Sequence, residues 1–242
     1  MQQISDFAAT AIMGTRTLSN QDILDAELAR ARHALAYLKQ KIGNDSMRKL
    51  LREDLLAMTA RVQQWLRESK GAWQSGSVEL IVPGPTATDF RTWYAEAMSQ
   101  GWELDLWAGH PEHFMNHPVQ DSIEVMENIG ETELPWHIFY RSLSEDARLP
   151  SSWDDFYPVH FAAEIVDAEG TGIGYSMREL RDDTDGLHMK LTSHLPAAVP
   201  PRLVELHLHH FSIEYRNWAH FAAKGIAAES RANATRSNGN GL

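Results

Sequence analysis

The sequence predicts an α+β protein in which an antiparallel sheet wraps around one long C-terminal helix, with a helical part at the N-terminus. Apolar residues recur at helical spacing before residue 73, and they alternate with polar residues in several segments between residues 122 and 195. A further amphipathic stretch fills residues 202–228. Runs of strands followed by a helix are typical of α+β domains rather than of alternating βαβ folds.

The first 73 residues contain two amphipathic segments. In the first, Ser19 precedes a stripe of apolar residues that are spaced by three and four and that end at Ile42. Gly43 interrupts the stripe, and the same spacing resumes from Met47 to Trp65. We interpret residues 1–73 as an N-terminal helical hairpin. This hairpin is either a module that packs on the main domain, or an arm for dimerisation or a lid. A homodimer is therefore one possible state of the protein.

The strands are expected after residue 76. A strand at 78–83 is followed by a helix at 88–100, and we expect a further short strand at 103–107. Turn sequences at 167–170 and 183–186 separate alternating segments, as in an antiparallel meander. The remaining predicted strands are 122–129, 134–143, 159–167, 171–180 and 187–195.

The last predicted helix follows Pro200 and Pro201, because proline suits the first helical turn. We place the main domain at residues 74–228. The remaining residues, 229–242, are rich in Asn, Ser and Gly, and we expect a disordered tail. A curved sheet closed by a C-terminal helix resembles the helix-grip arrangement of START and Bet v 1-like proteins, which leaves a cavity between sheet and helix.

Composition excludes several classes of partner and site. The formal net charge is −11, with 33 acidic and 22 basic side chains, so we expect neither a nucleic-acid nor a membrane partner. There is no cysteine, so any metal must be held by nitrogen and oxygen. The N-terminal residues lack the pattern of a secretory signal, and no apolar run approaches about 20 residues. We therefore expect a cytoplasmic protein.

The best candidate for chemistry lies on the last helix. His210 and Glu214 are four residues apart, which places both side chains on one helical face. Histidine and carboxylate ligands suit Zn²⁺. His207 lies on the same side, three residues earlier, whereas His209 is expected to face solvent. Read alone, the pair could equally be an ion pair on the helix surface.

Two further segments could complete a metal site. The loop after Trp107 carries His110, His113 and His117, although such a loop is often only solvated. In the strand at 122–129, alternation places Glu127 on the apolar face, where a carboxylate needs a partner such as a metal ion. The alternative is a glutamate at a sheet edge that points to solvent.

Taken together, these residues resemble the zinc-dependent C–C hydrolases that act on diacetylphloroglucinol and the related phloretin hydrolases. The resemblance covers about residues 90–224. The motifs that carry it are Trp107, HPEH at 110–113, VMENIG at 125–130, RELRDDTDGLHMK at 178–190 and HFSIE at 210–214.

The resemblance implies a Bet v 1-like catalytic domain that cleaves the bond between an acyl carbon and a phenolic ring. It implies zinc as the cofactor and a small aromatic ketone as the substrate. The zinc ligands fall on His113, Glu127, His210 and Glu214, and Asn116 matches a position that contacts the substrate ketone.

This sequence departs from the family pattern at three places, one of which is Lys190, in a stretch where the family tends to have arginine. The spacing between Trp107 and Pro111 is two residues longer, which keeps His110 as a rival ligand to His113. Leu104 stands where the family has a tyrosine that helps to hold the acyl carbonyl, so the substrate can differ from the family's best-known one.

The predicted function is a metal-dependent hydrolase of acylated phenols. We take His160 and Tyr175 as candidate general acid/base residues, because their strands can face the cavity; ordinary packing or surface positions are the alternative. A metal-free ligand-binding protein or a polyketide cyclase-like enzyme is the alternative function.

Overall fold

The computed structural model describes residues 8–129, 132–143 and 147–239, with side chains up to residue 225. It divides into two compact units, Met1–Gly43 and Asn44–Leu242. No helix in the described part is both long and apolar enough for a membrane crossing.

The first unit is a short strand pair followed by a helix. Strands β1 (Ala11–Met13) and β2 (Arg16–Leu18) form an antiparallel hairpin that the sequence did not predict. Helix α1 (Asn20–Ile42) begins at a reciprocal capping box between Ser19 and Asp22. It ends at Gly43, whose φ of 70° is easily adopted only by glycine.

The second unit begins with two helices that belong with the sheet. They are α2 (Asn44–Leu50) and α3 (Arg52–Ser69). The apolar stripe of α3, including Met58 and Val62, joins a core cluster with strand residues such as Ile138. The two predicted N-terminal helices therefore lie in different units, and the boundary is at Gly43 rather than near residue 73. The apolar stripe of α3 packs on the sheet within the second unit.

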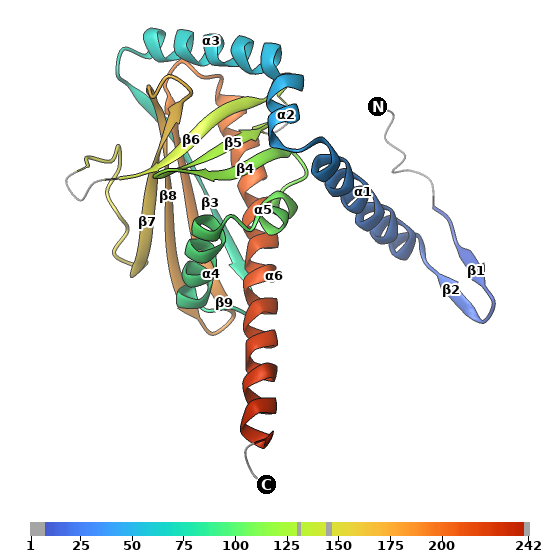
Figure 1. The fold of residues 1–242 in the computed structure, drawn as a ribbon. Helices are drawn as coiled ribbons and strands as arrows, with labels where there is room; N and C mark the ends of the chain where they lie inside the picture. Colours follow the sequence, from blue (N-terminus) through green and yellow to red (C-terminus); the bar gives the residue numbers. More distant parts are fainter. Residues whose placement is uncertain (1–7, 130–131, 144–146, 240–242) are drawn as a thin grey trace. The chain divides into compact units, whose positions relative to one another are not determined.

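The main sheet has seven antiparallel strands in the order β3-β9-β8-β7-β6-β5-β4 (Figure 1). Except for β3, the strands follow one another as neighbours, so the predicted meander is confirmed. β3 pairs with the last strand along its whole length. The strands are β3 (Trp73–Val82), β4 (His113–Val119), β5 (Ser122–Glu127), β6 (Trp136–Ser142), β7 (Val159–Asp167), β8 (Gly172–Asp183) and β9 (Gly186–Pro196).

Helix α6 (Pro201–Gly239) runs along the sheet, with α4 (Ala87–Gln100) and α5 (Glu103–Gly109) beside it (Figure 1). The core between α6, α4 and the sheet is aromatic, and includes Phe90, Tyr215 and Trp218. The sheet order and the long helix together make this a helix-grip fold, as the sequence predicts.

Two predicted elements differ from the structure. The segment 103–107, expected as a strand, is helix α5: Leu106 and Trp107 are buried side by side while Leu104 is exposed, which suits a helix and not an alternating strand. The segment 229–242, expected to be disordered, continues helix α6 as far as Gly239; residues 229–238 contain neither glycine nor proline. Residues 240–242 lie outside the described part.

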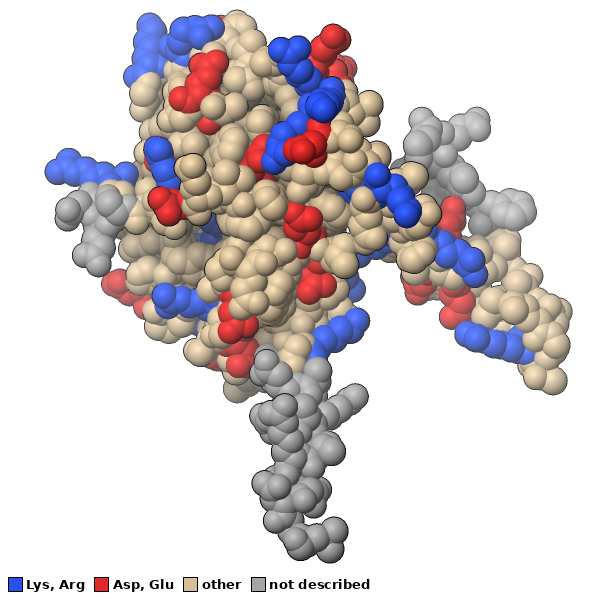
Figure 2. Space-filling view, in the orientation of Figure 1, with Lys and Arg blue, Asp and Glu red and all other residues tan. Residues whose placement is uncertain are grey.

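A buried ion pair ties α2 to the sheet. Arg48 donates to both carboxylate oxygens of Glu124, at 2.9 and 2.6 Å, and His137 lies 2.8 Å from the same carboxylate. Burial opposes the ionised form, but His137 and Arg48 outweigh it and lower the pKa of Glu124 to about 2. Elsewhere on the visible face of this unit, Figure 2 shows acidic and basic side chains interspersed.

We expect Glu124→Gln to destabilise the second unit by about 1–3 kcal/mol at neutral pH, because it removes the charged partner of Arg48 on the sheet and leaves only Asp45, an exposed aspartate on α2 itself. The pKa of Glu124 is lower in the folded state than its ordinary value of 4.5, so its contribution is complete above pH 4.5 and is lost as the pH falls towards 2. Urea denaturation of wild type and variant at several pH values measures this. A difference in unfolding free energy between the two proteins that stays constant down to pH 2 would contradict this prediction.

Candidate metal centre

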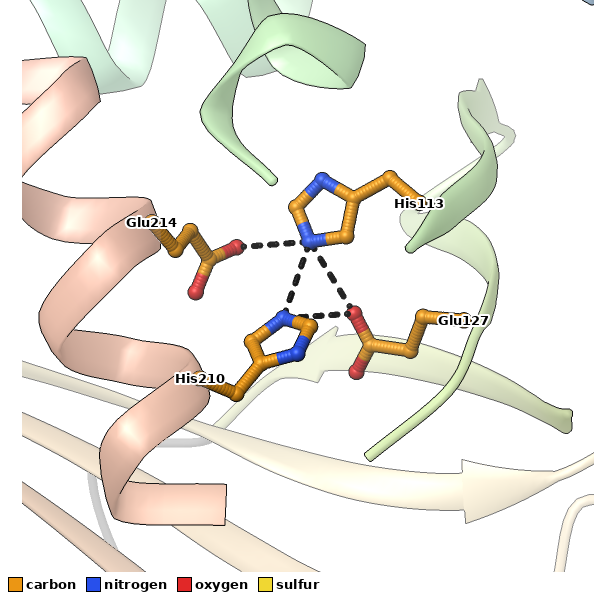
Figure 3. A group of neighbouring side chains, drawn as sticks. All are labelled: His113, Glu127, His210 and Glu214. Carbon is orange, nitrogen blue, oxygen red and sulfur yellow. Dashed lines mark hydrogen bonds and ion pairs between the residues drawn. The ribbon is translucent and has the colours of Figure 1, made fainter. Parts of the chain in front are cut away.

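Three elements bring four predicted ligands together. His113 opens β4 and Glu127 closes β5, and the two residues face each other in the strand register. His210 and Glu214 lie one turn apart on α6 and point at the same place (Figure 3). The predicted set of two histidines and two glutamates is thus assembled from the sheet edge and the C-terminal helix.

The distances fit a small cation. The Nε2 atom of His113 lies 3.1 Å from Nε2 of His210, 3.2 Å from Oε2 of Glu127 and 3.3 Å from Oε1 of Glu214. His210 Nε2 lies 3.5 Å from Glu127 Oε2. Zinc bonds of about 2.0–2.2 Å in a tetrahedron separate neighbouring ligand atoms by roughly 3.3–3.6 Å. The four donor atoms therefore stand close to the spacing of a zinc ligand set.

The charges and burial of the four side chains also suit a divalent cation. All four are at most 6% exposed. Two carboxylates buried without a counter-charge would be costly, and one doubly charged ion balances them. Burial raises the pKa of Glu214 and lowers that of His210, so both groups are pushed towards their neutral forms when no ion is present.

His113 behaves differently from His210. Burial by itself lowers the pKa of His113, but hydrogen bonds to Glu127 and Glu214 outweigh it and raise the pKa to about 10. Without a metal, the imidazolium of His113 is therefore the cation that the two carboxylates share. A metal ion would replace that proton as the positive charge between them.

The ring of His113 is held by the end of α5. Its Nδ1 lies 3.0 Å from the carbonyl oxygen of Leu106, which accepts the Nδ1 proton and leaves Nε2 directed at the other ligands. Asn217 on α6 donates to the carbonyl of Gly109 at 2.8 Å and so links the same end of α5 to the helix.

A β-bulge brings Asn116 to the same side as His113. Residues three apart in a regular strand face opposite ways. Here the register shifts between His113 and Met115: His113 pairs with Glu127, and Asn116 pairs with Val125. The extra residue in β4 therefore places the predicted ligand and the predicted substrate contact on one face of the sheet.

A cavity of about 20 Å³ adjoins the ligands, which is room for one or two water molecules. Asn116, Glu127 and Glu214 line it, and the amide oxygen of Asn116 has no hydrogen-bond partner among the described residues. The other lining residues are Tyr94, Met98, Ile123, Val125, Tyr140, Arg178 and Trp218. The position predicted to contact the substrate thus lies next to the candidate metal ligands.

A larger groove of about 370 Å³ lies between the end of α4 and the β4–β5 turn. Met98, Ile123 and Tyr140 line both the groove and the cavity. An aromatic ligand that enters by this route has to displace these side chains. Among the three, Met98 is the unbranched and most adaptable one.

The two other candidate ligands lie beside the set. The ring of His110 stacks on that of His210, with centroids 3.7 Å apart, and its Nδ1 accepts from the backbone N–H of Glu112. His207 is fully buried and its Nδ1 lies 2.9 Å from Ser193 Oγ. Between the two loop histidines, the structure therefore favours His113 as the ligand.

The structure does not bring the predicted acid/base residues to the cavity. His160 is exposed and stacks on Trp153, with ring centroids 4.4 Å apart. Tyr175 packs edge-on against Trp73 at 5.4 Å and lines a separate surface hollow. The expectation that these strand positions face the cavity is wrong, because the alternation of β7 and β8 turns both side chains to the other face.

Tyr94 and Arg178 line the cavity but were not predicted as site residues. Tyr94 lies in α4, whose residues gave no signal beyond helical spacing. Arg178 was noticed only as part of a motif. An arginine on a strand usually points to solvent. Residues 176–180 of β8 are all buried, so no alternation along this strand could have shown that Arg178 points inward.

Of the comparisons with known proteins, only the one with solved structures finds matches, and these are remote. No protein-family model and no curated protein matches this chain. The crystal structure of Ara h 8.0201 has a TM-score of 0.42 and 12% identity, and the match covers 63% of this chain and 99% of that one. An uncharacterized protein from Rhizobium leguminosarum has a TM-score of 0.38 and 13% identity, over 63% and 96% of the two chains.

A conserved protein from Geobacillus kaustophilus has a TM-score of 0.34 and 13% identity, over 65% and 96% of the two chains. Likenesses at these scores carry no argument about chemistry. The helix-grip assignment accordingly rests on the strand order and α6 themselves.

We expect Gly109→Ala to disturb the metal centre. A Cβ atom there would lie 2.3 Å from Nε1 of Trp218, so the end of α5 must shift, and the segment that carries His113 with it. The overpacking should cost about 1–3 kcal/mol of stability and weaken zinc binding. Denaturation and competition with a chelating dye measure the two effects.

Gly225→Ala on α6 is the matched control, because nothing lies within 4 Å of the added methyl group. It should bind zinc like the wild type and be as stable or slightly more stable. Equal zinc affinity in all three proteins would contradict the role given to Gly109.

Proposed function

We propose that this chain is a metal-dependent hydrolase, with zinc as the ion, that cleaves the carbon–carbon bond between an acyl group and a phenolic ring. The observation that supports it most is the buried set of His113, Glu127, His210 and Glu214 beside a cavity that Asn116 lines. The ligand atoms of this set lie within 4.8 Å of one another. The substrate class is a small aromatic ketone.

The reaction consumes one water molecule and needs no oxidant. The water oxygen forms a bond to the acyl carbon, and the bond from that carbon to the ring breaks. The electron pair stays on the ring carbon, which takes up a proton, so the products are a carboxylic acid and a deacylated phenol. The ring carbon leaves most easily when the ring is in its keto form, because the departing pair is then delocalised onto an oxygen.

Zinc, when bound, polarises an oxygen of the substrate and lowers the pKa of water to around 7. The protein's own residues bind the substrate and orient it. Asn116 can donate its amide N–H to the ketone oxygen. Burial raises the pKa of Tyr94 and of Tyr140, so both phenols stay protonated and can donate a hydrogen bond in the cavity. With His160 and Tyr175 turned away, these two tyrosines are the better candidates for proton delivery.

A metal-free ligand-binding protein or a cyclase-like enzyme is the second candidate. One observation favours it: protonated His113 can satisfy Glu127 and Glu214 without any metal ion. A helix-grip fold with an aromatic-lined cavity suits that function equally well. Metal content separates the two candidates.

We expect protein purified without added metal to hold about one zinc ion per chain by elemental analysis. His210→Ala and Glu214→Ala should each lose most of it, since either change removes one of four ligands. His209→Ala is the control, because this neighbouring histidine is exposed. Full zinc content in both ligand variants would remove the proposed site, and an empty wild type would favour the metal-free candidate.

We also expect the zinc-loaded protein to release acid and phenol from acylated polyphenols, measured by chromatography of both products. Asn116→Ala should lower kcat/KM about tenfold or more, because it removes a hydrogen bond to the reacting ketone. Met98→Ala should leave zinc content unchanged and raise kcat/KM for bulkier acyl groups. A wild-type rate no higher than that of zinc ions alone would contradict the hydrolase proposal.

A further inference from the structure

Arg178 is a buried cation without a charged partner. It lies on β8, is 3% exposed, and lines the cavity together with Glu127 and Glu214. Within the described part of the chain, no carboxylate oxygen lies within 4 Å of its guanidinium. Arginine cannot shed its proton in a protein, so the charge stays. Buried charges are normally paired with an opposite charge, and the guanidinium of Arg178 lacks such a contact.

The groups in direct contact with Arg178 are neutral, although its charge acts at longer range on Glu214 and opposes the rise in the pKa of that carboxyl. Its Nε donates to the hydroxyl of Tyr215 at 2.6 Å, and Nη1 donates to the carbonyl of Ser176 at 3.0 Å. Four aromatic rings surround it, those of Tyr94, Tyr140, Phe161 and Tyr215, with centroids 5.5–6.0 Å from Cζ. These contacts hold the guanidinium in place, but none of them neutralises it.

The contacts also leave donors free for a ligand. The two hydrogen bonds use two of the five N–H groups of the guanidinium. The side chain borders the cavity, so the remaining donors can reach an acceptor there. An oxyanion on a flat ring is the ligand that suits them, because its charge balances Arg178. Its ring can pack among the surrounding aromatic side chains once Met98, Ile123 and Tyr140 move aside, since the cavity of about 20 Å³ holds only one or two water molecules.

We infer that Arg178 is a specificity residue that binds the phenolate oxygen of the aromatic ligand. This inference rests on the proposed function and deepens it: the ring that leaves the acyl group does so as an oxyanion, and Arg178 holds that oxygen while Asn116 and the metal ligands face the acyl side. It requires no covalent step of its own. Among the acylated phenols of the proposed function, the substrates are then those with an ionised hydroxyl on the side of the ring that reaches Arg178.

The test is direct binding of 4-nitrophenol, whose phenolate is followed by its absorbance. Wild-type protein should bind the phenolate and lower its apparent pKa. Arg178→Met should weaken phenolate binding about tenfold or more and leave binding of the neutral ether 4-nitroanisole unchanged. Arg178→Lys keeps the charge without the planar guanidinium group. Its affinity for the phenolate should lie between those of the wild type and Arg178→Met. This second variant keeps the test informative if the methionine variant folds poorly by circular dichroism.

Arg181→Met is the matched control. Arg181 lies on the same strand, but it contacts Asp183 and the ring of Phe156 away from the cavity. This variant should bind phenolate like the wild type. Equal phenolate binding in wild type and Arg178→Met, or an equal loss for the neutral ether, would overturn the inference. Tighter binding of benzoate than of phenolate would overturn the phenolate assignment in favour of a carboxylate ligand.

Zinc content measured on the same samples separates the two proposals. Arg178→Met should retain the metal of the wild type, since it is not a ligand. If the wild type holds no zinc and Arg178 still selects the phenolate, the hydrolase proposal fails and the inference about Arg178 stands. If zinc is present and Arg178→Met binds the phenolate as tightly as the wild type, only the inference about Arg178 fails.

Discussion

Two carboxylates, those of Glu127 and Glu214, lie almost fully buried and within 3.3 Å of the same imidazole nitrogen. Burying one such charge is expensive, and burying two side by side is tolerable only if a positive charge is shared between them. A protonated His113 or a divalent cation can supply it. Either way, the sheet edge and the C-terminal helix are held to each other by this charge balance.

The scaffold meets this constraint with regular elements. The antiparallel register of β4 and β5 sets His113 opposite Glu127, and the helical turn of α6 sets His210 beside Glu214. Sites on regular elements hold their geometry better than sites on loops. The bond from His113 Nδ1 to the carbonyl of Leu106 adds the orientation that pairing alone does not fix.

Much of the site could be predicted because its pattern is local. The i, i+4 spacing of His210 and Glu214 needs only a helix, and the inward face of Glu127 needs only the alternation of β5. The long C-terminal helix follows from the same helical period. Short motifs supplied the set of four ligands, and the structure brings those residues together.

The wrong predictions have one cause. Tertiary contacts decide which face of a strand is turned to the cavity and which element a helix packs against, and a local pattern does not contain them. His160 and Tyr175 sit on correctly predicted strands, but the face that each strand presents to α6 could not be fixed from the alternation alone. Segment 103–107 is too short for its period to separate helix from strand. One helix was predicted from Met47 to Trp65, and the structure divides it at Leu51 into α2 and α3. Packing on the main domain was one of two open alternatives, because an apolar stripe does not specify what covers it.

The bulge in β4 has a consequence for how this chain can change over time. Single insertions or deletions in most strands are absorbed at the turns. In β4, one residue more or fewer between His113 and Asn116 would send one of them to the opposite face of the sheet, while Glu127 stayed in place. A length change is therefore compatible with this geometry only beyond these two positions, as in the β4–β5 turn. The length of the interval matters to the site as much as the residues at its ends.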